Sequence, residues 1–233
     1  CSTYTLALPG AGEDASATGD LDIRQSLTIT GNGSATTIID GGGLDRVFDI
    51  GPGVTLTMSG VKIQNGNTTA DGGGILNAGT LNLSDAIVTS NTANNGGGIA
   101  NGITGTANLS NVTLNSNETT FNHGGGLFNE NNATLDNVTV SNNKALGGYG
   151  GGIKNYGSAA TLTLTNSTIG SGNKAEFGGG IAIDGTATIS GTTITNNTAT
   201  ADGGGIWNDG TANVTNSTIS GNSITADTAR GGG

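Results

Sequence analysis

A Gly-Gly-Gly triplet that recurs about every 26 residues constrains the fold of this chain more than any other feature. The triplets begin at Gly72, Gly96, Gly124, Gly150, Gly178, Gly203 and Gly231, at spacings of 24, 28, 26, 28, 25 and 28 residues. An apolar residue follows each of the first six, at Ile75, Ile99, Leu127, Ile153, Ile181 and Ile206. Self-similarity with this period indicates a repeat architecture, in which each unit buries its apolar face only against its neighbours.

Each repeat contains three short segments in which apolar and polar residues alternate, as they do in β-strands. The first segment follows the triplet. The second carries the apolar pairs Leu81/Leu83, Ala107/Leu109, Ala133/Leu135, Leu162/Leu164, Ala187/Ile189 and Ala212/Val214, and the third ends on Val88, Leu114, Val140, Ile169, Ile194 and Ile219. Parallel crossovers are overwhelmingly right-handed. We therefore predict an all-β chain that forms a single right-handed parallel β-helix (a β-solenoid).

The predicted solenoid has about eight coils of 24–28 residues. Residues 1–16 form an N-terminal strand and loop, residues 17–71 form two degenerate coils, and residues 72–233 form six repeats that each begin with a triplet. The whole chain is thus expected to be one β-helix domain, roughly 40 Å long at about 4.8 Å per coil.

Two asparagine columns follow the same repeat. The first holds Asn77, Asn101, Asn129, Asn155 and Asn208, with Ile183 in the remaining repeat, and the second holds Asn91, Asn117, Asn143, Asn173, Asn197 and Asn222. A buried amide at a coil corner donates to the amide of the next coil or to turn carbonyls. We therefore expect two structural Asn ladders, with a small apolar patch where Ile183 interrupts the first.

Composition excludes several classes of function. Charged residues make up only 10% of the chain, and the net charge of −10 argues against nucleic acid and anionic membranes as partners. No apolar run approaches the ~20 residues that span a bilayer, so we expect no membrane span. The single cysteine, Cys1, excludes an internal disulfide, and with the lone His123 it excludes the usual Cys/His zinc site.

Several segments carry a family resemblance. The stretch from Tyr4 to Asp14, the segment Gly19-Asp-Leu-Asp-Ile and the segment that runs from Thr37 to Asp49 resemble the CSLREAI-type secreted bacterial proteins. The Gly-Gly-Gly-Ile-x-Asn units are similar to the Gly-Gly-Ala-(Ile/Leu/Val) and Phe-x-x-Asn repeats of chlamydial polymorphic outer membrane proteins, although glycine replaces their alanine and Phe128-x-x-Asn131 is the one Phe-x-x-Asn. The resemblance covers essentially the whole chain and implies a β-helix in an extracellular or bacterial cell-surface location.

Because β-helices commonly carry polysaccharide lyases and hydrolases, we searched the sequence for catalytic groups. The basic residues Arg24, Arg46, Lys62, Lys144, Lys154, Lys174 and Arg230 are scattered, mostly on turns, and no cluster of Asp and Arg on neighbouring coils is evident. Asp136, Asp184 and Asp209 belong to different repeat positions, whereas inverting hydrolases need a carboxylate pair. His123 precedes a triplet and is expected to be a solvated turn residue. We predict no enzyme activity and no catalytic residues.

Acidic residues gather near the N-terminus at Glu13, Asp14, Asp20, Asp22, Asp45 and Asp49. The favoured interpretation is a set of solvated acidic turns, with no cofactor and no metal site. The alternative is Ca²⁺ held by these carboxylates together with corner carbonyls, since calcium takes six to eight oxygen ligands.

Three further sets of residues are candidates for contact with partners. Thr113, Thr139, Thr168, Thr193 and Thr218 form a candidate outward Thr face, beside an expected column of Asn82, Asn108, Thr134, Thr163, Thr188 and Asn213. Threonine is favoured on any exposed strand, and the alternatives are ice binding and glycan contact. Leu76, Phe128 and Trp207 share one outward repeat position and are candidate exposed apolar contacts.

The favoured function is a non-catalytic secreted or cell-surface module with a structural or adhesive role. Solenoids need capped ends, and the sequence offers no capping segment. We therefore expect self-association end to end into fibres, or stacking on neighbouring coils of a longer chain. The alternatives are a carbohydrate-binding or polysaccharide-degrading β-helix and an ice-binding solenoid with a Thr ladder.

Overall fold

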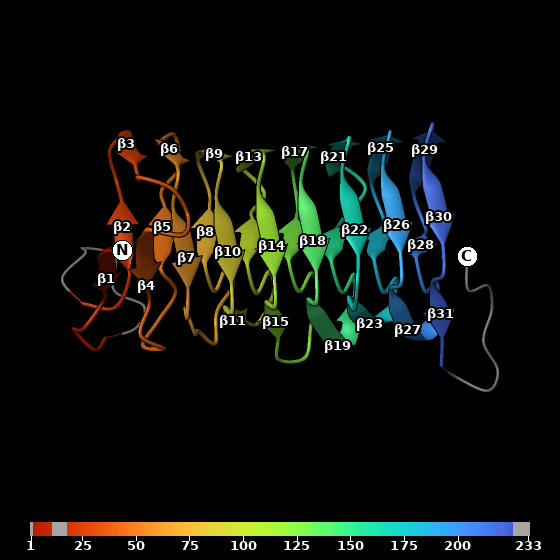
Figure 1. Ribbon diagram of the computed structural model, residues 1–233, viewed down its shortest axis with the longest axis horizontal. Coiled ribbons are helices and arrows are strands. Elements are labelled where there is room, and N and C mark those ends of the chain that lie inside the picture. The colour runs from red at the N-terminus through yellow and green to blue at the C-terminus, as the bar shows by residue number, and fades with distance from the viewer. Residues whose placement is uncertain (1, 11–17, 226–233) are drawn as a thin grey trace.

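A computed structural model describes residues 2–10 and 18–225 of the chain. In this part of the chain the fold is all-β, with parallel strands stacked into a solenoid of about eight turns. In Figure 1 the chain rises through the rear strands, crosses the top, descends through the front strands and advances toward the right, which is a right-handed path. The predicted right-handed parallel β-helix is therefore confirmed.

The strands form four sheets, and from β8 onward each coil contributes one strand to each sheet, whereas the first two coils have no strand in sheet D. Sheet A contains β1 (Ser2–Thr5), β4 (Thr37–Asp40), β7 (Lys62–Gln64), β10 (Ile87–Thr89), β14 (Thr113–Asn115), β18 (Thr139–Ser141), β22 (Thr168–Gly170), β26 (Thr193–Thr195) and β30 (Thr218–Ser220). Sheet B contains β2 (Leu21–Ile23), β5 (Phe48–Ile50), β8 (Ile75–Asn77), β12 (Ile99–Asn101), β16 (Leu127–Asn129), β20 (Ile153–Asn155), β24 (Ile181–Ile183) and β28 (Ile206–Asn208).

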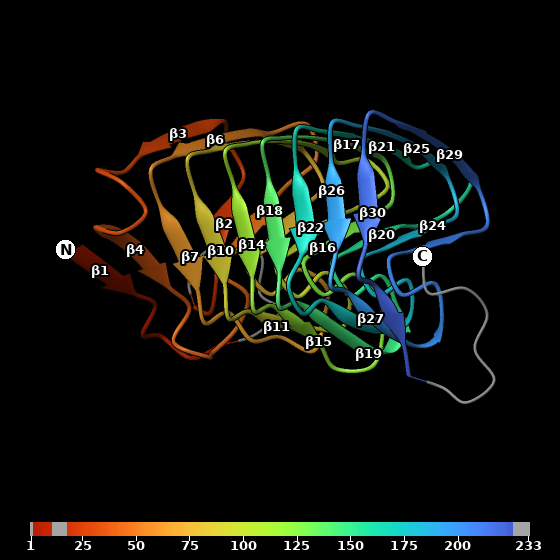
Figure 2. The ribbon, with the colours of Figure 1, turned by 45° about the vertical axis from the view of Figure 1, so that its right-hand side comes forward.

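Sheets C and D complete the coil. Sheet C contains β3 (Leu27–Thr30), β6 (Thr55–Ser59), β9 (Thr80–Ser84), β13 (Thr106–Ser110), β17 (Asn132–Asp136), β21 (Thr161–Thr165), β25 (Thr186–Ser190) and β29 (Thr211–Thr215). Sheet D contains β11 (Thr92–Ala93), β15 (Glu118–Thr119), β19 (Lys144–Tyr149), β23 (Lys174–Phe177), β27 (Thr198–Asp202) and β31 (Ser223–Ile224). The chain passes through the sheets in the order B, C, A, D, and sheet D forms the lower edge in Figure 2.

Sheet D corrects the expectation of three strands per repeat. Its first strands, β11 and β15, have two residues each, and a two-residue strand is too short to show alternation in the sequence. The later strands β19, β23 and β27 are longer, and the register between them shifts at a bulge. Two of these longer strands, β19 and β23, end on Tyr149 and Phe177, which belong to the aromatic patch described below.

The triplet glycines are required by two different constraints. Gly96 has a φ of 59°, a left-handed conformation that glycine adopts without steric cost. A Cβ on Gly97 would lie 2.4 Å from the carbonyl oxygen of Glu118, and a Cβ on Gly98 would lie 2.6 Å from that of Gly126. The first glycine therefore turns the chain from sheet D into sheet B, and the other two let neighbouring coils approach.

Other corners use asparagine and serine in the left-handed region. Between sheets C and A this conformation is adopted by Asp85, Asn111, Asn137, Asn166 and Asn216, and between sheets A and D by Asn65, Ser90, Ser116, Asn142, Ser171 and Asn196. Short polar side chains that hydrogen-bond locally make this region accessible to residues other than glycine. Many asparagines outside the two ladders are thus needed at the corners where the chain turns from one sheet to the next.

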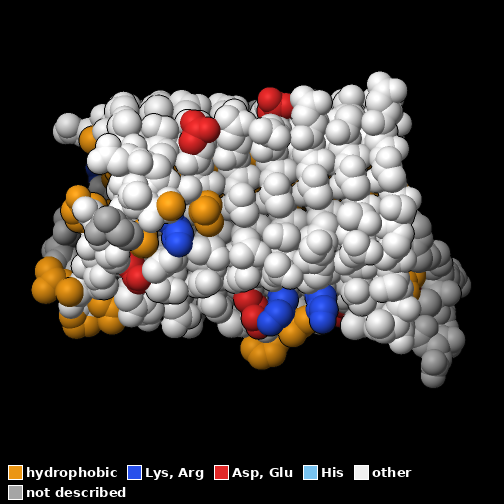
Figure 3. Space-filling model, in the orientation of Figure 1, with side chains coloured by type: hydrophobic (Ala, Val, Ile, Leu, Met, Phe, Trp, Pro, Cys, Tyr) orange, Lys and Arg blue, Asp and Glu red, His pale blue; other side chains and the backbone are white. Residues whose placement is uncertain are grey.

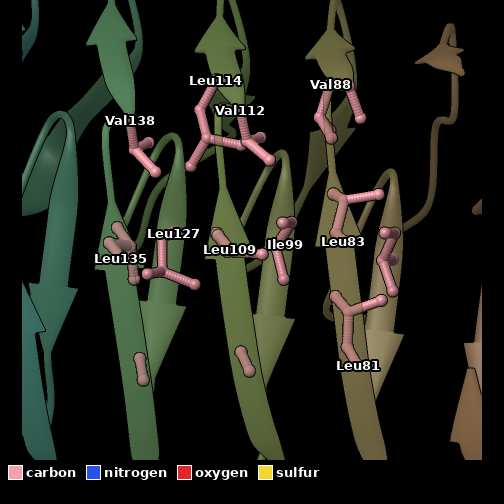
Figure 4. Close-up of a cluster of buried hydrophobic side chains, with 14 of the residues drawn as sticks. Leu81, Leu83, Val88, Ile99, Leu109, Val112, Leu114, Leu127, Leu135 and Val138 are labelled. Carbon is pink, nitrogen blue, oxygen red and sulfur yellow. The ribbon is translucent and has the colours of Figure 1, made fainter. Parts of the chain in front are cut away.

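The interior is filled by files of aliphatic side chains, two from sheet C and one each from sheets A and B. Leu81 and Leu83 from sheet C meet Val88 from sheet A, and Ile99 and Leu127 from sheet B close the layers (Figure 4). These side chains are almost fully buried. Burying each one stabilises the fold by about 1.5–3 kcal/mol, so the narrow core is continuous along the axis.

Candidate binding face

The second asparagine column forms a ladder that is hydrogen-bonded from coil to coil. Each Nδ2 donates to the Oδ1 of the next asparagine at 2.8–3.1 Å, through Asn91, Asn117, Asn143, Asn173, Asn197 and Asn222. The same amide nitrogens also donate to strand carbonyls of the preceding coil, as Asn117 does to Val88 at 3.0 Å. These amides are hydrogen-bonded to one another and to the backbone, so their role is structural.

The first asparagine column is a ladder only in part. Asn77, Asn101, Asn129 and Asn155 are linked by amide–amide bonds of 2.7 Å. Ile183 occupies the next position in register and is buried in the hydrophobic core. Beyond it, Asn208 is exposed, and its Nδ2 donates to the Gly210 carbonyl instead of to another amide. Asn208 therefore lies in the predicted column but outside the hydrogen-bonded ladder.

The predicted Thr face lies on the outer side of sheet A. Thr113, Thr139, Thr168, Thr193 and Thr218 stand in register on consecutive strands. Figure 3 shows that few charged or apolar side chains occupy the C-terminal half of this side. The other outward positions of these strands are mixed, with Asn115, Ser141, Gly170, Thr195 and Ser220. Sheet A thus presents a single regular file of threonine.

The column that begins at Asn82 is not beside this file, which corrects the sequence interpretation. Asn82, Asn108, Thr134, Thr163, Thr188 and Asn213 lie on sheet C. There the column borders a shallow groove of about 280 Å³, which Thr57, Ser84, Ser110 and Asp136 also line. The two candidate polar columns are on different sides of the solenoid and cannot form one flat array.

The N-terminal acidic residues form ion pairs with two arginines, contrary to the expectation that no Asp–Arg cluster spans neighbouring coils. Arg46 pairs with Asp49 at 3.0 Å and with Asp20 at 3.5 Å, and Arg24 pairs with Asp49 at 3.3 Å. Burial raises the pKa of Asp20 to about 7, although the charge of Arg46 opposes this rise. The cluster was hidden in the sequence because its members belong to the coils that depart most from the repeat.

No group of three or more His, Cys, Asp or Glu residues is arranged to hold a metal ion within residues 2–10 and 18–225. Asp20, Asp45 and Asp49 are buried rather than solvated. Cys1, Glu13, Asp14 and Arg230 lie outside the described residues. The calcium alternative therefore stays a hypothesis.

The outer side of sheet B differs from sheets A and C in chemistry. Three columns of residues run along it parallel to the solenoid axis. The first column, just before the triplets, contains Asp71, Asn95, His123, Tyr149, Phe177 and Asp202. The second column, in mid-strand, contains Leu76, Ala100, Phe128, Lys154, Ala182 and Trp207. The third column, just after the strands, contains Glu130, Tyr156, Asp184 and Asp209. Asp184 and Asp209 share the third column, so the expectation that they belong to different repeat positions is wrong for this pair. Large, varied side chains thus replace the repetitive Thr, Ser and Asn of the other faces.

Aromatic rings from these three columns contact one another. The resulting aromatic patch consists of His123, Phe128, Tyr149, Tyr156, Phe177 and Trp207, packed around Lys154. The Tyr149 and Phe177 rings stack with centroids 4.7 Å apart, and Trp207 meets Tyr149 edge-on at 4.9 Å. Phe128 and Tyr156 lie 5.4 Å apart. Five of the eight Phe, Tyr and Trp residues of the chain are in this patch.

Lys154 is enclosed at the centre of the patch. Its Nζ lies 4.7 Å from the ring centroid of Tyr149 and 5.1 Å from that of Trp207, and it forms an ion pair with Asp184 of the next coil. The residue is only 2% exposed. Burial lowers its pKa, and Asp184 opposes that shift. The expectation that the basic residues lie mostly on turns is wrong, because Lys154 lies on β20 and the other three lysines, Lys62, Lys144 and Lys174, begin β7, β19 and β23.

His123 joins the same patch and is not a solvated turn residue. The Tyr149 N–H donates to its Nδ1 at 3.1 Å, so this nitrogen carries no proton. Its ring stacks on Phe128 and Tyr156 and contacts Tyr149 edge-on. Burial, followed by the charge of Lys154, lowers the pKa of His123. The imidazole therefore acts as a neutral aromatic ring.

The three residues predicted as exposed apolar contacts differ in their exposure. Phe128 is only 4% exposed, because neighbouring rings cover it, so its expected role as an exposed contact is wrong. Trp207 and Leu76 are half-buried, and only Trp207 belongs to the patch.

Three residues of the patch, Tyr149, Tyr156 and Phe177, were not predicted from the sequence. The position just before each triplet was the available signal, since His123, Tyr149 and Phe177 occupy it in consecutive repeats.

None of the described segments forms an apolar helix of membrane-spanning length. Comparison with family models, with curated proteins and with solved structures gives no match for this chain.

Proposed function

We propose that this chain is a non-catalytic, rigid β-solenoid module with a structural and adhesive role in a secreted or cell-surface setting. The observation that carries the proposal is the contrast between a uniformly laddered scaffold and one chemically varied face on sheet B. Amide ladders and a continuous aliphatic core fix the coils, and the aromatic patch is confined to one side. Such a rod holds a contact surface at a defined orientation.

The charge arrangement supports a role without catalysis. Lys154 is committed to Asp184 and to the surrounding rings, and Arg46 is committed to two aspartates. A general base or acid must reach the proton that it transfers, and these buried groups have partners within the protein. The resemblance to secreted β-helix surface proteins supports the location.

Both ends of the described solenoid support self-association end to end. At the N-terminal end, Leu6, Leu21, Ile29, Ile39 and Phe48 line an apolar hollow of about 400 Å³. At the other end, Val214 and Ile219 are 40% and 38% exposed, although their equivalents in earlier coils are buried. A second copy, or neighbouring coils of a longer chain, would cover this apolar surface.

The proposal is tested by measuring adhesion and turnover with the same protein. Beads coated with the purified chain are passed over immobilised cellulose, chitin and polygalacturonate, with beads carrying the heat-unfolded chain as the control. We expect the folded chain to be retained on at least one surface, with no release of reducing ends and no absorbance from unsaturated uronate products. Turnover that disappears in Asp184→Asn would contradict the non-catalytic role, and equal retention of folded and unfolded chains would contradict adhesion.

A further inference from the structure

We propose that the aromatic patch binds a linear glycan without acidic substituents, which lies along the solenoid axis over sheet B. This inference rests on the proposed adhesive function and names its ligand class. It is argued from the position of the patch, its partly exposed rings, the carboxylates on its border and its charge.

The patch is not required by the fold. Its rings lie outside the core, and equivalent mid-strand positions on the same sheet are occupied by Ala100 and Ala182. Aromatic residues make up only 3% of the chain, yet five of them and the one histidine gather here. Local departures from the repeat support them, since Tyr149 ends the long, bulged strand β19. The cluster is therefore a feature added to a regular scaffold.

Five of the six rings of the patch are partly exposed to a ligand, since His123, Tyr149 and Phe177 are half-buried and only Phe128 is buried. Tyr156 is 44% exposed, and Trp207 is half-buried. Their neighbours hold them in place, since Tyr156 packs on Phe128 and His123, and Trp207 packs on Tyr149 and Phe177. Rigid amphipathic rings bury a large apolar area at little entropic cost. The C–H face of a pyranose is an apolar surface of matching size.

Hydrogen-bond acceptors lie beside these rings. Glu130, Tyr156, Asp184 and Asp209 follow successive strands of sheet B, and their backbone N–H groups each bond to the preceding coil. Successive coils are about 4.8 Å apart, and one sugar of an extended glycan advances by about the same length. Carboxylates accept hydrogen bonds from hydroxyl groups. The column thus offers acceptors at a spacing that suits consecutive sugars.

The charge of the patch selects among glycans. Its one lysine is buried and paired with Asp184, whereas Glu130 and Asp209 add negative charge. A uronate or sulfate ester would be repelled, because like charges across an interface are unfavourable. A cationic ligand would find the space between Tyr149, Tyr156 and Trp207 already filled by Lys154. Glycans without acidic groups are the class that remains.

The single tryptophan of the chain lies in the patch, so its fluorescence reports binding directly. The full chain is titrated with cellohexaose, chitohexaose, xylohexaose and laminarihexaose, and with polygalacturonate and heparin as acidic probes. We expect a saturable change in Trp207 emission with at least one of the four hexaoses and none with the acidic probes. Calorimetry on variants then locates the site.

Tyr156→Ala and Trp207→Ala are each expected to weaken binding of that hexaose at least tenfold. Leu76→Ala is the matched control, because Leu76 occupies the same mid-strand column as Trp207 outside the patch. Circular dichroism checks that each variant is folded, and the exposed Tyr156 gives a variant that leaves the core untouched.

Absence of saturable binding by all four hexaoses would overturn the inference. Tighter binding of polygalacturonate, or full affinity in Tyr156→Ala, would overturn it as well. These outcomes are separable from failure of the proposed function. If the beads adhere but no hexaose binds, the adhesive function is supported and this glycan site is contradicted. If a hexaose is bound and then cleaved, the glycan site is supported and the non-catalytic role is contradicted.

Discussion

Asparagine meets two unrelated physical demands in this chain. In the ladders a buried amide satisfies both its donors and its acceptor through neighbouring coils, as Asn117 does with Asn91, Asn143 and Val88. At the corners, residues such as Asn111 adopt a positive φ that most side chains avoid. Replacing a ladder asparagine therefore removes buried hydrogen bonds, whereas replacing a corner asparagine affects a left-handed backbone conformation.

Asn117→Ala is expected to lower the free energy of unfolding by about 3 kcal/mol, because it leaves buried polar groups of the adjacent coils without partners. Urea denaturation followed by circular dichroism measures this change. Asn208→Ala is the matched control, since Asn208 is exposed and outside the ladder. We expect a loss of no more than about 0.5 kcal/mol there. Equal losses in the two variants would show that the ladder contributes nothing specific.

Asp20 makes the stability of the N-terminal coils dependent on pH. Its pKa is about 7 in the folded chain against 3.8 for an unperturbed carboxyl, so the folded state binds the proton more tightly than the unfolded state. The stability that this group contributes is complete below pH 3.8 and is lost as the pH rises through 7. Asp20→Asn is therefore expected to stabilise the chain at pH 8 by on the order of 2–4 kcal/mol.

Urea unfolding of both proteins between pH 4 and pH 8 tests this expectation. The gain from Asp20→Asn should shrink as the pH falls. A variant that is less stable than the parent at pH 8 would show instead that the ion pair with Arg46 outweighs the cost of burial.

At the scale of the coil, the triplets set how closely successive strands approach. Gly97→Ala is expected to destabilise the solenoid by about 3 kcal/mol, because the new Cβ would press on backbone atoms of Glu118. Gly102→Ala is the matched control in the same coil, where the nearest atom to a new Cβ is a carbonyl oxygen at 3.5 Å. Thermal unfolding should show a clear loss for the first variant and almost none for the second. Similar losses would contradict the role assigned to the triplet.

The repeating parts of each coil could be predicted from the sequence, and the parts that depart from the repeat could not. The aliphatic pairs such as Leu81 and Leu83 alternate with period two, which indicates both the strand and its inward side. Sheet D was missed because a two-residue strand such as Thr92–Ala93 has no period. The ion pair of Lys154 with Asp184 was missed because its members occupy different columns of different repeats.

The aromatic patch could be predicted only in part for the same reason. Trp207 and Phe128 share a mid-strand position and were grouped from the sequence. Tyr149 and Phe177 reach the patch from the end of sheet D, across a corner whose bulge changes the register. A side chain's direction after a bulge depends on backbone geometry, which residue spacing alone does not fix.

At the scale of the whole molecule, both ends of the described rod expose apolar side chains, and the described residues form no helix. If the ends stack, the apolar side chains at the C-terminal end, Val214 and Ile219, become part of the contact. Ile219→Asp is expected to abolish association that increases with concentration, because it places a charge in that contact. Thr193→Asp, on the side of sheet A, is the control that should leave association unchanged.

Solution scattering over a range of concentrations provides the measurement. The parent chain should show a forward scattering intensity per unit mass that rises with concentration. A parent chain that stays monomeric at every concentration would contradict end-to-end stacking.

The asparagine ladder also gives the rod a direction. From Asn91 to Asn197 every amide–amide hydrogen bond runs the same way, with the Nδ2 donating toward the C-terminal end and the Oδ1 of the next asparagine accepting from the N-terminal side. Two copies that meet C-terminal end to C-terminal end would therefore oppose donor to donor, and only a copy added in the same orientation continues the row. Any assembly built by extending this ladder is consequently polar, with a distinguishable growing tip at each end.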